Sequence, residues 1–285
     1  MSEGGGARLR RRLPRGRTIA KHLVLSAVAV VIAFPFYWML TTALKSFFEA
    51  TLFPPTLFPN EFHPENFAQA WAAAPWPRYF ANTVIIAVIV TAGEVTTAVL
   101  AAYAFARMHF RGKQLIFMLF LATLMIPSEA TLIPNYVLVT KYLRWGNTYQ
   151  AQIVPFLASA FSIFLLRQHF LSIPNELADA ARIDGAGHLR FLRSVVLPLS
   201  VPVLVTVALI QGIGVWDSFL WPLLVTSSDT VRPIQVGMSQ FRTEFGAQYH
   251  LEMAAATFVI APIVLVFLVA QRHLIQGVAR TGIRG

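Results

Sequence analysis

The sequence predicts an all-helical integral membrane protein with six transmembrane helices. Of its 285 residues, 56% are hydrophobic and 13% are charged, whereas soluble domains carry about 25% charged residues. Six apolar stretches approach or exceed the roughly 20 residues that a helix needs to cross the hydrocarbon core. They run from Leu23 to Leu44, Thr83 to Ala106, Leu115 to Pro127, Tyr149 to Leu166, Val201 to Val225 and Ala254 to Ala270.

The six stretches differ in how cleanly they fit a membrane span. The first follows a basic segment, as in a signal peptide, but it is too long for one and ends in 34–38, an aromatic and proline run without a cleavage site. The third is short, because Pro127 ends it, and we expect 133–139 to form a short helix at the membrane interface. The second and fifth each contain one carboxylate, Glu94 and Asp217.

The basic residues orient these spans. Lysine and arginine are enriched in cytoplasmic loops, and 17 of the 23 lie in the N-terminus, 107–113, 167–193 and the C-terminus. Both termini are therefore predicted to be cytoplasmic. The expected organisation is a basic N-terminal segment (1–22), a transmembrane domain (23–272) with a cytoplasmic loop at 167–198, and a C-terminal tail (273–285).

The cytoplasmic loop 167–198 is unusually elaborate, because connections between helices are usually only a few residues long. Pro174 can begin a helix, and Gly185 marks its end or a sharp turn with a positive φ. Small and apolar residues recur at helical spacing between them. A second short helix, 189–196, leads into the fifth span. A helix–turn–helix with a small-residue surface fits the groove of another protein, although it could also merely join two spans.

Several chemistries are excluded by the residues. The chain has no cysteine, which rules out thiolate and disulfide chemistry. Gly112-Lys113-Gln114 lacks the upstream glycine and the hydroxyl residue after the lysine that a phosphate-binding loop needs. The seven histidines show no metal-ligand spacing, and no nucleophile elbow is present. We therefore expect a protein that is not an enzyme and binds neither a metal nor a cofactor.

The run Asp179-Ala180-Ala181-Arg182-Ile183-Asp184-Gly185, followed after nine residues by Val195-Val196-Leu197-Pro198, resembles the EAA signature of binding-protein-dependent ABC importer permeases. The spacing matches in full, with Asp179 in place of glutamate and Val195 in place of isoleucine. Segments such as 123–127, 164–168 and 216–224 are similar to the carbohydrate-uptake branch, and within it to the six-helix subunit of maltose and glycerol-3-phosphate transporters. The resemblance covers about residue 20 to the C-terminus.

This resemblance implies a type I ABC importer permease in the cytoplasmic membrane of a bacterium or archaeon. It implies a second homologous permease, two cytoplasmic ATPases that bind ATP-Mg, an extracytoplasmic solute-binding protein, and no nucleic acid as partner. Each ATPase would accept a coupling helix in a cleft, so that ATPase closure drives alternating access. The implied coupling residues are Asp179, Ala180, Ala181, Arg182, Asp184, Gly185, Leu197 and Pro198.

The translocation pathway has four candidate residues, Glu94, Asp217, Trp216 and Trp221. Carboxylates within spans are costly and usually face the protein interior. Asp217 lies between two tryptophans, and a carboxylate with aromatic faces suits a polyhydroxylated solute; an interhelical hydrogen bond or a gate contact would explain it equally. Small and hydroxyl neighbours favour a packing role for Glu94.

The expected function is import of a mono- or oligosaccharide. The alternative is import of glycerol-3-phosphate or a related polyol by the same machinery. An ion-coupled secondary carrier is a further class, but such carriers often show internal repeats, and no convincing duplication is visible here.

Overall fold

The computed structural model describes residues 15–245 and 248–281, and within these ranges every regular element is a helix. The long helices are α1 (Arg15–Ala43), α4 (Trp76–Arg107), α8 (Ala160–Ser172), α11 (Leu197–Trp216) and α14 (Tyr249–Thr281). The shorter ones are α2 (Phe47–Thr51), α3 (Glu65–Ala72), α5 (Lys113–Thr123), α6 (Ser128–Val137), α7 (Tyr149–Ile153), α9 (Asn175–Ile183), α10 (His188–Phe191), α12 (Leu220–Val225) and α13 (Ile234–Phe245). Single π-helical turns span Leu138–Tyr142 and Leu192–Val196, and a 3-10 turn spans Val154–Phe156.

The prediction of an all-helical membrane fold is confirmed. Among the described residues, five helices are long and apolar enough to cross a membrane. A sixth arises if α5 is counted together with the following segment Ser128–Tyr142, from which it is bent by 95°. This bend is where the sequence predicts the third span to stop, since Pro127 stands at the N-cap of α6 and disfavours helical backbone in the residue before it.

The prediction that the fifth span runs from 201 to 225 is wrong about both its start and its end. One continuous helical stretch runs from His188 to Trp216, so the expected short helix 189–196 is its first part rather than a separate element. The stretch ends at Asp217, and α12 follows as a separate helix. Pro222 explains the break, because it has no N–H to donate to the carbonyl of Ser218 and its ring would clash there.

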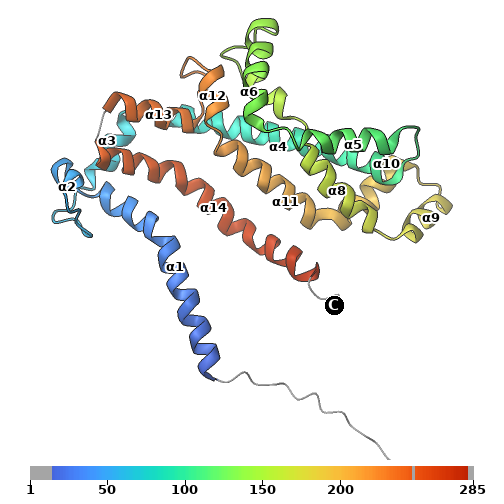
Figure 1. The fold of residues 1–285 in the computed structure, drawn as a ribbon, viewed down its shortest axis with the longest axis horizontal. Coiled ribbons are helices and arrows are strands. Elements are labelled where there is room, and N and C mark those ends of the chain that lie inside the picture. The colour runs from blue at the N-terminus through green and yellow to red at the C-terminus, as the bar shows by residue number, and fades with distance from the viewer. Residues whose placement is uncertain (1–14, 246–247, 282–285) are drawn as a thin grey trace, which may run out of the picture. The chain divides into compact units, whose positions relative to one another are not determined.

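The chain divides into two compact units. One comprises the described residues of Met1–Ala68 together with Gln248–Thr257, and the other those of Gln69–Ala247 and Phe258–Gly285. In the larger unit α4 packs against both α8 and α11 (Figure 1). Fully buried Ala98 and Ala102 on α4 let the helices approach closely around Leu166, Phe170 and Val196. This core supports the segment 174–198.

Candidate functional site

The segment 174–187 forms an elbow, a short helix that ends in a sharp turn, as its sequence predicts. Pro174 is the N-cap of α9, and at the other end Gly185 has φ +74°. The amide of Gly185 donates to the carbonyl of Arg182 (3.0 Å), and that of Ala186 donates to the carbonyl of Ala181 (2.8 Å). These are the two bonds of a Schellman motif, which satisfies the last carbonyls of a helix. A Cβ on Gly185 would meet nothing within 4 Å, so glycine is needed there for its backbone conformation alone.

The elbow presents a mixed apolar and charged surface. No residue of α9 is buried, and Ile183 is 87% exposed. Asp179 and Arg182 form an ion pair of 3.2 Å in which both side chains are exposed, so it adds little stability.

The predicted coupling residues do not all share this surface. Asp179, Ala180, Arg182, Asp184, Gly185 and Pro198 are exposed. Ala181 and Leu197 are half-buried and pack against the core instead. Six of the eight predicted coupling residues are therefore open to a partner, and the other two pack against the core of this chain.

Arg107, at the end of α4, anchors the start of the elbow. Its guanidinium donates to Asn175 Oδ1 (2.6 Å), to the carbonyl of Phe170 (2.6 Å) and to that of Ile173. The carbonyls at the end of α8 are thereby satisfied by a cation, which also suits the helix dipole. In the sequence, Arg107 served only as one of the basic residues that assign the loop 107–113 to the cytoplasmic side. Nothing in its position along the chain indicated that it binds the start of the elbow.

A second contact holds the other arm of the elbow to α4. The Tyr103 hydroxyl lies 3.1 Å from Nδ1 of His188, the first residue of α10. Between α4, the end of α8 and the elbow lies a cavity of about 540 Å³, whose lining includes Tyr103, Arg107 and Arg182. Both arms are therefore tied to α4 around a polar space.

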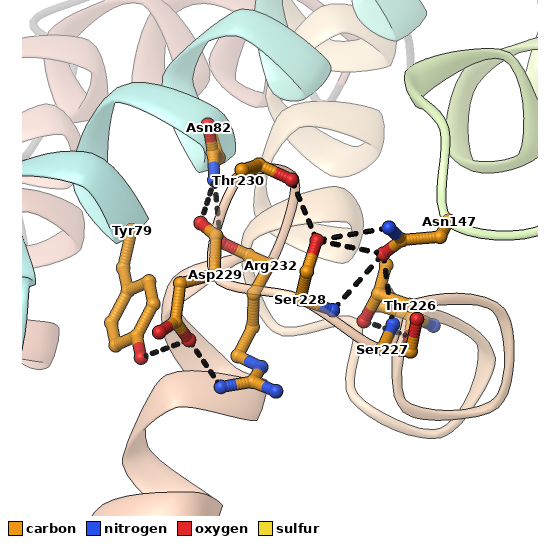
Figure 2. A network of polar contacts seen from close by, with 10 residues as sticks. Tyr79, Asn82, Asn147, Thr226, Ser227, Ser228, Asp229, Thr230 and Arg232 are labelled. Carbon is orange, nitrogen blue, oxygen red and sulfur yellow. Dashed lines mark hydrogen bonds and ion pairs between the residues drawn. The ribbon is translucent and has the colours of Figure 1, made fainter.

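The opposite end of α4 holds the loop 226–233 through a polar network (Figure 2). The Tyr79 hydroxyl donates to Asp229 Oδ1 (2.8 Å), and Asp229 also pairs with Arg232. Asn82 donates to the carbonyl of Arg232 (2.8 Å). On the far side of the loop, Asn147 Oδ1 accepts from the amides of 227 and 228 (2.9 and 3.0 Å). The loop is thus fixed to α4 and to the turn before α7.

Glu94 is fully buried in α4, next to a break in the fourth span. Thr97, one turn on, donates to the carbonyl of Leu157 in this break. A Cβ on Gly93 would lie 2.5 Å from Leu157 Cδ2, so glycine permits a close approach. Neither carboxylate oxygen of Glu94 has a hydrogen bond of ordinary geometry to the described residues.

The structure separates the other pathway candidates. Asp217 is exposed at the end of α11, distant in sequence and in element from Glu94. Trp216 donates to the carbonyl of Val259 (3.2 Å) and lines an apolar groove. Trp221 is buried, donates to the carbonyl of Ala151 (2.9 Å) and lines a different cavity. The two tryptophans therefore line different cavities, and neither cavity includes Glu94 or Asp217 among its lining residues.

The cavity beside Trp221 has the composition expected for a sugar contact. Its volume is about 240 Å³, and Gln152, Gln211, Phe156, Ser218 and Trp221 are among its lining residues. Oε1 of Gln152 is buried without a partner among the described residues. Amide and aromatic side chains suit hydroxyl-rich solutes. The sequence alone did not identify either glutamine as a site residue. A single uncharged amide in an apolar stretch gives no functional signal until the residues around it in space are known.

The comparisons with known proteins agree with this architecture. Residues 94–280 match the family model "Binding-protein-dependent transport system inner membrane component". The arabinooligosaccharides transport system permease protein AraQ of Halalkalibacterium halodurans is 35% identical over 73% of this chain and 74% of its own. The sn-glycerol-3-phosphate transport system permease protein UgpE of Yersinia enterocolitica is 34% identical over 92% and 96%.

Among solved structures, a chain of a bacterial ABC transporter involved in the import of the acidic polysaccharide alginate has the same fold. It superposes with a TM-score of 0.81 at 21% identity, covering 95% of this chain and 99% of that one. A chain of the bacterial alginate ABC transporter in complex with an alginate pentasaccharide-bound periplasmic protein gives a TM-score of 0.63 at 14% identity. The match over more than half of the chain, together with these relatives, shows that the protein belongs to the inner membrane components of binding-protein-dependent ABC transport systems.

Proposed function

We propose that this chain is the permease subunit of an ATP-driven, binding-protein-dependent importer of sugars, with the elbow 174–187 as its coupling helix. The similarity to permeases named for arabinooligosaccharides and for glycerol-3-phosphate supports carbohydrate import. A sugar is the first choice of substrate and glycerol-3-phosphate or a related polyol the second. The observation that carries the coupling role is an exposed elbow continuous with the long helix His188–Trp216.

In this proposal the elbow is cytoplasmic, as are both termini, because 17 of the 23 lysines and arginines lie on that side. Residues 1–22 and 273–285 are the cytoplasmic segments that flank the permease domain. One of two cytoplasmic ATPases docks on Ile183 and the charges around it. When the ATPases bind ATP-Mg and close, the docked elbow moves, and α4 and the long helix move with it. This chain supplies no catalytic group to the hydrolysis.

The remaining partners are a second, homologous permease and an extracytoplasmic solute-binding protein. The solute passes from the binding protein to the membrane at the end of α4 where the loop 226–233 is fixed. The cavity lined by Gln152, Gln211 and Trp221 opens near this end and offers hydrogen bonds and an aromatic face to sugar hydroxyls. We assign it, rather than Glu94, to the translocation pathway.

Site-directed cross-linking tests the docking surface, and the absence of native cysteine makes single-cysteine variants straightforward. Ile183→Cys should cross-link to the ATPase that co-purifies with the tagged chain. The matched control is Tyr142→Cys, which is also strongly exposed but lies on another element and should give no such product. Purification without any ATPase, as expected for an ion-coupled carrier, would refute the proposal.

A further inference from the structure

The segment between α1 and α3 is packed with its polar groups inside. Lys45 is 1% exposed and Glu49 is 6% exposed, and Asn66, in the first turn of α3, is likewise buried. Lysine and glutamate are almost never fully buried unless they are paired, so these side chains need partners inside the segment.

The buried polar groups are satisfied within the segment itself. Lys45 Nζ donates to the carbonyl of Thr56 and lies 4.7 Å from the centre of the Trp38 ring. Glu49 Oε1 accepts from the Thr56 hydroxyl (2.8 Å) and from the amide of Asn60 (2.9 Å). Burial lowers the pKa of Lys45, while the nearby charge of Glu49 opposes that change. Internal satisfaction of polar groups is what a lipid environment demands, because lipid tails offer no hydrogen bonds.

The outer surface of the segment is aromatic and apolar. Phe53 is 95% exposed, Phe48 79% and Phe58 70%, with Leu52 and Leu57 open between them. From Ser46 to Asn60 the only charged residue is the buried Glu49. We call 46–60 the aromatic cap. Side chains of this size exposed together mark a surface that is covered in the working protein.

The aromatic cap is continuous with a transmembrane helix. The Tyr37 hydroxyl, in the last turns of α1, donates to the carbonyl of Leu57 (2.8 Å), and the rings of Tyr37 and Phe58 lie 5.9 Å apart. The 25 residues Ile19–Ala43 of α1 form one of the candidate spans. Immediately beyond the cap, Glu61 and Glu65 expose their carboxylates. Apolar and charged surfaces therefore follow one another along the segment, as they do across a membrane interface.

We propose that the aromatic cap is inserted into the lipid bilayer at its interface, with Phe48, Phe53 and Phe58 among the acyl chains and Glu61 in water. This goes beyond the transport function, because it assigns the segment to the membrane rather than to the solute-binding protein or the second permease. Aromatic side chains are favoured at this depth. The cap then holds the end of α1 at a fixed level in the bilayer.

Spin-label accessibility tests the proposal on the assembly purified through a tag on this chain and reconstituted into liposomes. Single cysteines replace Phe48, Phe53 or Phe58, and Glu61→Cys is the control on the same segment. Labels on the cap should collide with oxygen, which dissolves in lipid, and be shielded from a water-soluble nickel chelate. The label at Glu61 should show the reverse, so that the oxygen-to-nickel ratio differs several-fold.

Two outcomes would overturn the proposal. Free access of the nickel chelate to the cap would place it in water. Immobile labels that neither reagent reaches would mean that a protein partner covers it. Leu52→Cys and Leu57→Cys, which remove less of the side chain, replace any phenylalanine variant that fails to assemble or to transport.

Discussion

Replacing Gly185 by threonine should impair coupling without removing any contact. The residue has φ +74°, a conformation that costs an L-amino acid about 1–2 kcal/mol, and a β-branched side chain is an outlier there. A Cβ at this position meets nothing within 4 Å, so the whole penalty is conformational. A penalty of this size lowers the ratio of native to non-native elbow by a factor of about 5–30. Sugar uptake by proteoliposomes should fall, by up to that factor, while the membrane level of the protein holds.

Gly187→Thr is the matched control for this substitution. Gly187 has φ −73° as the N-cap of α10, it also has open space around its Cα, and threonine is about as good an N-cap as glycine. Gly185→Asn should restore much of the uptake, because asparagine tolerates the left-handed region. Equal uptake by the two threonine variants, whether both normal or both impaired, would refute the assignment of the defect to the Gly185 backbone.

Three further substitutions test the anchors and the cavity. Arg107→Lys loses the guanidinium fork and should destabilise the protein by about 1.5–3 kcal/mol in detergent unfolding, whereas the exposed Arg111→Lys should not; an equal effect of both would argue against the anchor. Asn147→Ala should cost about 2–4 kcal/mol in the same assay, because it loses its bonds to the loop and strains a backbone at φ +58°. Asn147→Gly loses the same hydrogen bonds but carries no backbone strain, so it should destabilise the protein less than Asn147→Ala. Equal destabilisation by the two variants would show that backbone strain does not contribute. Gln211→Leu should raise the half-saturating sugar concentration for uptake about 2–10-fold, and an unchanged value would remove the cavity from the pathway.

Elements governed by local rules could be predicted from the sequence. The position of Pro174, the positive φ of Gly185 and the end of the third span near Pro127 each depend on residues within one turn of helix. The apolar spans were equally visible, because a membrane imposes a length and a composition on every helix that crosses it. The family resemblance placed the proposed coupling residues Asp179 to Gly185 on the elbow, and Leu197 and Pro198 at the start of α11.

Features that depend on distant residues could not be predicted. Arg107 reaches carbonyls more than 60 positions away, and no periodicity reveals such a partner. The tryptophans on either side of Asp217 are close in sequence, yet the break before α12 turns them toward different cavities. The single fifth span was a wrong prediction because hydropathy registers apolar character and not the missing N–H of Pro222.

The unbroken course from His188 to Trp216 has a mechanical consequence. Its 29 residues correspond to a length of about 43 Å at 1.5 Å per residue, which exceeds the thickness of the hydrocarbon core. A tilt of about 10° over this length displaces one end by about 7.5 Å relative to the other, more than one helical turn. In the proposed mechanism, a small swing at His188 would therefore move Gln211 and its neighbours, which line the cavity assigned to the pathway.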